Sequence, residues 1–94
     1  MSHDVVLASA IRTPIGRFGG GLASVPAVDL GIAAAKAAIE RAGIPPEAVD
    51  QTILGHARQA GNGPNTARQV SYFSGIPQET NAFNVNMACA SGSK

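Results

Sequence analysis

The chain has 94 residues, of which 45% are apolar and only 14% are charged, and its formal net charge is +1. Soluble domains average about 25% charged residues, so this composition suits a buried α/β core without its outer cover, and we interpret the chain as one piece of a larger domain. The seven Lys and Arg residues are scattered along the sequence, which argues against nucleic acid as a partner.

Membrane and export signals are absent from the sequence pattern. No apolar run reaches the length of a membrane span. The opening residues 1–4 are not the basic and apolar segments of an export signal. The single cysteine, Cys89, has no partner for an internal disulfide and fits a reducing compartment. We therefore expect a cytoplasmic protein that does not bind membranes.

The first half of the chain predicts a strand, a helix and a second strand. Residues 5–8 form a short apolar run, which is typical of a strand buried on both faces. A Gly-rich loop follows over residues 11–22. A helix is predicted over about residues 25–42, because apolar residues recur at helical spacing before Gly43 ends it. The second strand is predicted over residues 51–55.

The second half of the chain predicts a further helix and strand. A second Gly-rich loop covers residues 56–64, a helix begins at Asn65 or Thr66 and ends at Ser74, and a strand over residues 82–87 leads into Cys89. The order is β-α-β-α-β, and the connections are long enough for right-handed parallel crossovers. The predicted fold class is α/β, a mostly parallel sheet with helices packed on it.

Cys89 is the main candidate for a catalytic residue. It follows a predicted strand and precedes the small residues Ala90, Ser91 and Gly92, which is typical of a strand-to-helix turn that presents a nucleophile, with Gly92 supplying backbone freedom. A thiol in the first turn of a helix faces free N–H groups and the helix dipole, which would lower its pKa. The same N–H groups would hold the oxyanion formed on attack at a thioester. The alternative is a small buried hydrophobe.

Structural interpretations fit the other candidates better. His56 has no cysteine or second histidine at ligand spacing, so no metal site is predicted and a hydrogen bond to backbone is favoured. Ser91 lacks the G-x-S-x-G setting of a hydrolase nucleophile and is expected to form hydrogen bonds at a helix start. Asn84 and Asn86 are expected to orient loops or to bond across a subunit interface. Neither Gly-rich loop carries a phosphate-binding motif.

Three segments together resemble one known family. They are Arg12-Thr-Pro-Ile-Gly-Arg-Phe-Gly-Gly20, the loop and helix start over residues 59–69, and Asn86-Met-Ala-Cys-Ala-Ser-Gly92. In order and spacing they resemble the thiolases, which are acetyl-CoA acetyltransferases and 3-ketoacyl-CoA thiolases. The resemblance covers the whole chain. It implies that residues 1–94 are the N-terminal portion of the thiolase N-terminal domain, ending just after the nucleophile.

The resemblance also implies an activity and its site. Cys89 would carry the acyl group as a thioester, and its backbone N–H would be one donor to the oxyanion. The enzyme would condense two acetyl-CoA to acetoacetyl-CoA or cleave 3-ketoacyl-CoA with CoA. Coenzyme A and acyl-CoA would be substrates, with no permanently bound cofactor. The family's fold is two similar halves packed face to face and assembled as a homodimer or homotetramer, and this chain would be the opening part of the first half.

Some of the family's machinery has no counterpart in these residues. The catalytic His, the second Cys and the CoA-binding loop domain belong to later sequence in the family, so we expect the 94-residue chain alone to be inactive. Arg12, Arg17, Arg58 and Arg68 are then expected in structural hydrogen bonds or subunit contacts more than on CoA phosphates. Two alternatives stay open, an inactive structural or partner-binding piece and a ketoacyl-synthase-type condensing enzyme. The segments around Arg12 and Cys89 favour a thiolase.

Overall fold

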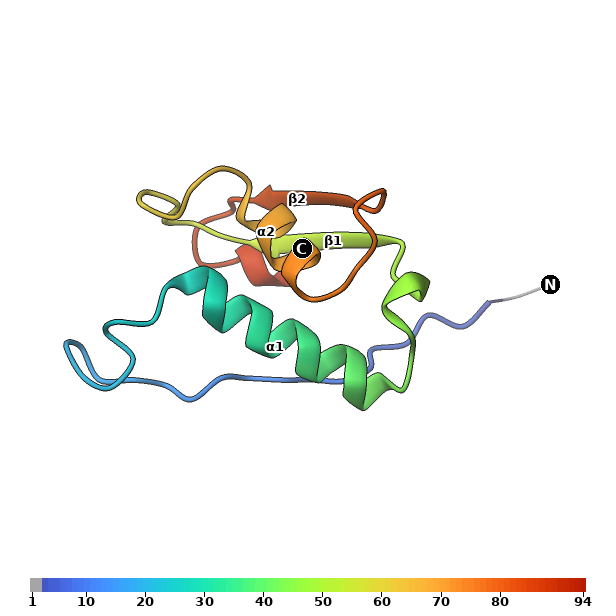
Figure 1. The fold of residues 1–94 in the computed structure, drawn as a ribbon, viewed down its shortest axis with the longest axis horizontal. Helices are drawn as coiled ribbons and strands as arrows, with labels where there is room; N and C mark the ends of the chain where they lie inside the picture. Colours follow the sequence, from blue (N-terminus) through green and yellow to red (C-terminus); the bar gives the residue numbers. More distant parts are fainter. Residues whose placement is uncertain (1–2) are drawn as a thin grey trace.

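The computed structural model describes residues 3–94. An extended N-terminal segment is followed by two helices and a two-stranded sheet (Figure 1). In chain order the elements are α1 (Ala27–Ala42), a 3-10 turn (Pro46–Ala48), β1 (Gln51–Gly55), α2 (Thr66–Phe73), β2 (Asn81–Val85) and a second 3-10 turn (Ser91–Ser93). None of the helices within residues 3–94 is long and apolar enough to cross a membrane.

The sheet is parallel, as the sequence predicts. Gln51 lies opposite Asn81 and Gly55 lies opposite Val85, and α2 provides the crossover between the two strands. The pairing continues one residue beyond β1, where the backbone N–H of His56 donates to the carbonyl oxygen of Val85 at 3.0 Å. Since parallel strands end at the same edge of a sheet, the segments that follow β1 and β2 emerge side by side.

The end of α1 and the start of α2 lie at the residues that the sequence indicates. Gly43 adopts a left-handed conformation (φ 69°) after α1, and its N–H donates to the Glu40 carbonyl, which is the usual helix-ending geometry. The side chain of Asn65 caps α2 by accepting the N–H of Arg68 at 3.0 Å. The predicted second helix is thus confirmed, with its last helical residue at Phe73.

The core lies where α2 packs on both strands and on α1. Ala67, Val70 and Ile76 are its buried apolar residues. A Cβ atom at Gly31 of α1 would lie 2.8 Å from Val70 Cγ2, so the two helices approach as closely as a glycine allows. Short side chains therefore set the spacing between the helices and hold α2, with its N-terminus, firmly against the sheet.

The predicted first strand does not form in this structure. Residues 5–8 are extended but pair with no strand among residues 3–94, and Val5, Val6 and Leu7 are 96%, 76% and 103% exposed. The prediction of a buried strand there is wrong for the described chain. An apolar run reports only that side chains favour burial, whereas a strand also needs a neighbour for its N–H and C=O groups. Figure 1 shows this segment running past α1 rather than beside β1 or β2.

Candidate active site

Cys89 lies on a sharp turn that begins directly after Val85, the last residue of β2. We call residues 86–92 the cysteine turn. The N–H of Ala90 donates to Met87 O at 3.0 Å and the N–H of Ser91 donates to Ala88 O at 3.2 Å. Ala88 has a φ of 50°, a left-handed conformation that costs a residue with a Cβ about 1–2 kcal/mol. Such a conformation persists where the surrounding contacts enforce it.

The turn differs from the sequence expectation in two respects. The left-handed residue is Ala88, before the cysteine, and not Gly92. Within residues 3–94, the helix expected around Cys89 is a 3-10 turn over Ser91–Ser93. The influence of a helix dipole on the thiol therefore stays a prediction. The Cys89 side chain is exposed, which contradicts the alternative of a small buried hydrophobe.

The Ser91 side chain holds the cysteine turn closed. It is only 6% exposed, and its Oγ accepts the N–H of Met87 at 2.9 Å while its hydroxyl donates to Ala88 O at 2.7 Å. Both of its hydrogen-bonding functions are used inside the turn. This confirms the hydrogen-bonding role that the sequence favours for Ser91 over that of a nucleophile.

Replacing Ser91 by alanine is expected to loosen the turn. Ser91→Ala removes the acceptor of the Met87 N–H and the donor to Ala88 O, and each hydrogen bond lost in this way lowers the unfolding free energy by about 0.5–1.5 kcal/mol. Urea unfolding of the complete natural polypeptide measures the loss. Ser93→Ala is the matched control, because Ser93 is exposed two residues later in the same 3-10 turn. Equal stability of the two variants would contradict the role given to Ser91.

Two asparagines connect the cysteine turn and β2 to neighbouring segments. Asn86 donates from Nδ2 to Ala57 O at 3.2 Å, and its Oδ1 accepts the N–H of Ala88 at 3.0 Å. Asn84 Oδ1 accepts the N–H of Ala67 at 2.9 Å at the start of α2. The expectation that these residues orient loops is confirmed for Asn86, whereas Asn84 bonds to the start of helix α2. Their use in a subunit interface stays a prediction.

Gly55, the last residue of β1, provides the space for the cysteine turn. A Cβ atom there would lie 2.6 Å from the carbonyl carbon of Ser91 and 2.7 Å from the nitrogen of Gly92. Both atoms belong to backbone, which has no rotamer to change. The close approach of β1 and the cysteine turn therefore depends on the missing side chain at Gly55. The sequence contains this glycine but no sign of what it approaches.

His56 makes a different contact from the one expected. Its Nδ1 lies 2.8 Å from Thr66 Oγ1, so its side-chain partner is a hydroxyl at the start of α2 and not a backbone carbonyl. The loop between these residues folds back and brings the end of β1 next to the start of α2. The spacing of residue types in the sequence does not predict this contact. Among residues 3–94, no group of three or more His, Cys, Asp or Glu side chains is placed to hold a metal ion.

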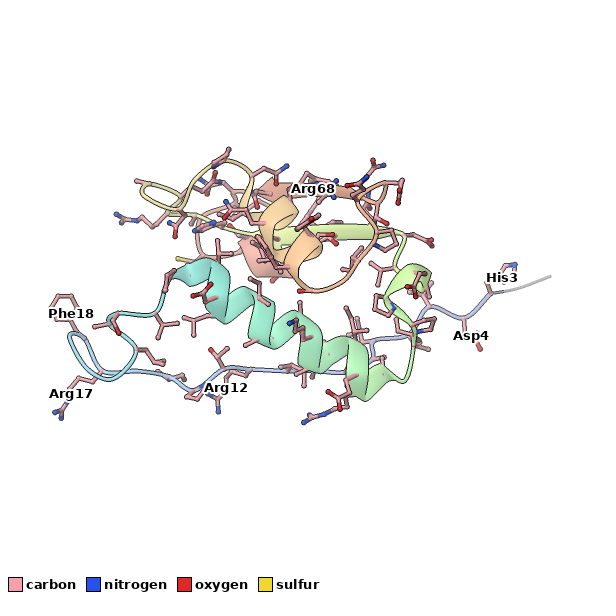
Figure 2. All side chains as sticks on the ribbon, in the orientation of Figure 1. His3, Asp4, Arg12, Arg17, Phe18 and Arg68 are labelled. Atoms are coloured by element: carbon pink, nitrogen blue, oxygen red, sulfur yellow. The ribbon has the colours of Figure 1, made fainter. Side chains whose placement is uncertain are left out.

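Arg12 and Arg68 bond to separate backbone carbonyl oxygens. Arg12 donates to Thr13 O at 2.9 Å, and Arg68 donates from Nη2 to Thr80 O at 2.6 Å. Figure 2 shows Arg12 and Arg17 along the N-terminal segment, with α1 between them and Arg68 in that view. The predicted structural hydrogen bonds are confirmed for Arg12 and Arg68. Subunit contacts of the arginines stay a prediction.

Among residues 3–94, the backbone N–H of Cys89 has no hydrogen-bond acceptor. The hydrogen bonds that close the cysteine turn use the N–H groups of the neighbouring residues, and none of them uses that of Cys89. An exposed thiol and a free N–H of the same residue are therefore presented together. Chemically, this pair suits attack on a carbonyl carbon with a hydrogen bond to the oxygen that becomes negative.

Comparison with known proteins identifies relatives along the whole chain. The family model for the thiolase N-terminal domain matches residues 5–94. An acetyl-CoA acetyltransferase of Clostridioides difficile is 51% identical over 90 residues, which cover 96% of this chain and 84% of that protein. An acetyl-CoA acetyltransferase of Cupriavidus necator is 48% identical over 91 residues, 97% of this chain and 23% of that protein.

A solved structure agrees with the fold. The crystal structure of the Acat5 thiolase from Ascaris suum in complex with coenzyme A matches with a TM-score of 0.86 and 46% identity, over 88% of this chain and 22% of that one. The α/β fold class expected from the resemblance is thereby confirmed. The chain spans less than a quarter of the Cupriavidus and Ascaris proteins but most of the Clostridioides one. The chain belongs to the thiolase family, and the part of that family which it matches is the N-terminal domain.

Proposed function

We propose that this chain supplies the nucleophile of a thiolase, and that Cys89 is that nucleophile. The observation that carries the proposal is the cysteine turn. It is held by Ser91 and Asn86, has a left-handed residue immediately before the cysteine, and leaves the thiol and the N–H of Cys89 without a partner in the described part of the chain. A turn fixed in this way presents its sulfur at a constant position, which favours reaction with a bound substrate.

The reaction proceeds through an acyl-cysteine. The Cys89 thiolate attacks the carbonyl carbon of acetyl-CoA, and the resulting oxyanion accepts a hydrogen bond from the Cys89 N–H. Collapse of this adduct breaks the bond to CoA sulfur and leaves acetyl on Cys89. A base outside residues 1–94 then takes an α-proton from a second acetyl-CoA, and the resulting enolate carbon attacks the acetyl carbon on Cys89. Collapse of this adduct breaks the bond to the Cys89 sulfur, which forms acetoacetyl-CoA and returns the thiolate. Cleavage of 3-ketoacyl-CoA by CoA is the same sequence in reverse.

The proposal assigns the remaining roles to polypeptide outside residues 1–94, which form the N-terminal portion of the thiolase N-terminal domain. A base must take the proton from the Cys89 thiol, and His56 is already bonded to Thr66. The acyl-CoA pocket and the contacts of a homodimer or homotetramer also lie there, so these residues alone do not catalyse the reaction. CoA acts as a substrate, with no permanent cofactor. A lone cysteine fits action in the reducing cytoplasm.

A non-catalytic role is the second candidate. The exposed side chains of Val5, Leu7 and Phe18, at 96%, 103% and 104%, favour a piece that is completed by contacts with other polypeptide. The family match leaves the ketoacyl-synthase-type alternative without support. The two candidates differ in whether an acyl group ever resides on Cys89.

Steady-state kinetics of the complete natural polypeptide test the proposed function. With acetoacetyl-CoA and CoA as substrates, a thiolase forms acetyl-CoA, and reciprocal plots at several CoA concentrations give the parallel lines of a ping-pong cycle. Formation of acetyl-CoA with parallel lines is the expected result. Absence of turnover, or lines that intersect because both substrates bind before any product leaves, would overturn the proposed acyl-cysteine cycle.

A further inference from the structure

His56, Thr66 and Asn84 form a continuous chain of side-chain hydrogen bonds. His56 Nδ1 lies 2.8 Å from Thr66 Oγ1, which in turn lies 3.0 Å from Asn84 Oδ1. The same Asn84 oxygen accepts the backbone N–H of Ala67 at 2.9 Å. We call these three side chains the His56 relay. It joins the residue that follows β1, the first residue of α2 and the fourth residue of β2.

Only one arrangement of hydrogens satisfies the His56 relay. The Ala67 N–H is a donor, so the atom of Asn84 facing it is the carboxamide oxygen, which accepts hydrogen bonds and donates none. The Thr66 hydroxyl must then give its single hydrogen to Asn84. Thr66 Oγ1 is left as the acceptor toward His56, so the hydrogen of that bond belongs to Nδ1. The neutral ring is therefore the Nδ1–H tautomer.

Burial makes this direction costly to reverse. Thr66 is 2% exposed and Ala67 is fully buried, while the imidazole is half-buried beneath the first turn of α1. If Nδ1 carried no hydrogen, it would face the lone pairs of Thr66 Oγ1, because that hydroxyl's hydrogen is committed to Asn84. Because Thr66 is almost wholly buried, its hydroxyl has little exposed surface through which water could replace the lost bond. The relay thus fixes both the tautomer and the orientation of the imidazole ring.

The relay is located where the cysteine turn is attached to the rest of the chain. Gly55, directly before His56, packs against the backbone of Ser91 and Gly92. Ala57, directly after it, accepts the side-chain N–H of Asn86. The backbone N–H of His56 itself donates to Val85 O. Every one of these contacts fixes the path from β2 to Cys89, and His56 is in the middle of them.

We propose that His56 is a positioning residue for acyl transfer at Cys89, and that it acts through its Nδ1–H bond to Thr66. The imidazole does not exchange protons with the substrate in this account. It holds the end of β1 against the start of α2, and so keeps residues 55–57 where the cysteine turn needs them. The proposal rests on the proposed function, because positioning is defined here by the reaction that it serves.

The substitution test uses side chains that place a donor differently. His56→Asn puts a carboxamide N–H near the place of Nδ1–H, whereas His56→Gln puts it near that of Nε2, and His56→Leu removes it. The measurement is the single-turnover rate constant for acetylation of Cys89 by acetyl-CoA in the complete natural polypeptide. We expect Asn to stay near wild type and Leu to slow acetylation by up to about 10²-fold, as small misplacements of reacting groups do.

The tautomer is tested without any turnover. Long-range ¹⁵N–¹H correlation spectra of labelled protein distinguish the two neutral forms of His56. We expect the Nδ1–H form in the wild type and loss of that preference in Thr66→Val. In the double variant His56→Leu/Thr66→Val, we expect acetylation to be no slower than in His56→Leu alone. An Nε2–H tautomer, or losses in the double variant that simply add, would overturn the relay.

The outcomes separate this inference from the proposed function. If wild type acetylates Cys89 while Asn and Leu at position 56 give equal rates, the positioning role is wrong and the thiolase proposal stands. If wild type takes no acetyl group, both are wrong, since His56 then has no reaction to serve. Should His56→Leu fail to fold, the acetylation rate constants of His56→Asn and His56→Gln are compared. A faster His56→Asn variant supports the donor at Nδ1, and equal rate constants overturn it.

Discussion

Cys89→Ser is expected to abolish thiolase turnover in the complete natural polypeptide, by about four orders of magnitude or more. Serine keeps the size and the exposed position of the side chain, so the hydrogen bonds of Ser91 and Asn86 that hold the turn are untouched. The hydroxyl is far less ionised and less nucleophilic than a thiol near neutral pH, so the acyl-enzyme does not form at a useful rate. Acetyl-CoA release from acetoacetyl-CoA and CoA measures the loss.

A relocated thiol provides the control for position. In the double variant Cys89→Ser/Ser93→Cys, the thiol lies on an exposed residue four positions later, outside the cysteine turn of residues 86–92. We expect no recovery of turnover, because the new sulfur has neither the Cys89 N–H beside it nor the same location. Recovery would mean that any thiol near the end of β2 suffices, and that the geometry of the cysteine turn contributes little.

Gly55→Ala is expected to displace the cysteine turn. The added methyl carbon would lie 2.6 Å from the carbonyl carbon of Ser91 and 2.7 Å from Ser91 O and Gly92 N, all of them backbone atoms. Overpacking of this kind costs about 1–3 kcal/mol, and relief requires that β1 and the turn move apart. Because Cys89 moves with the turn, the acetylation rate constant should fall by as much as about 10²-fold.

The control for this variant is Gly21→Ala. A Cβ atom at Gly21 would meet nothing within 4 Å, and Gly21 is not among the glycines with positive φ. Any general effect of an added methyl group on the chain should therefore show in both variants. Urea unfolding and single-turnover acetylation are measured on each. An unaltered acetylation rate in Gly55→Ala would contradict the close packing of β1 on the cysteine turn.

The local part of the fold can be predicted from the sequence. Asn65 and Gly43 mark helix ends by their own side chain and backbone preferences, and both act at the predicted places. The strand over residues 51–55 forms at its predicted bounds, whereas the one predicted over residues 82–87 forms as Asn81–Val85, because the chain turns away toward Cys89 after Val85. The helical crossover fixes the parallel direction of the two strands. The apolar run at residues 5–8 failed as a strand because pairing depends on a neighbour, which no property of the run itself supplies.

The candidate site is predictable only where it depends on one segment. Cys89 stands out from the strand before it and the small residues after it. The left-handed residue could not be located in that way, because Ala88 has no intrinsic preference for its φ and is held by Ser91 and Asn86. The contact between His56 and Thr66 joins residues from different elements, and only the folded chain brings them together.

The most direct test of the central claim is to identify the residue that carries the acyl group. The complete natural polypeptide is incubated briefly with acetyl-CoA, quenched in acid, and analysed by intact mass and by peptide mapping. We expect one acetyl group per chain on Cys89, removed again when CoA is added. An unmodified Cys89, or an acetyl group on another residue that turns over with CoA, would contradict the central claim.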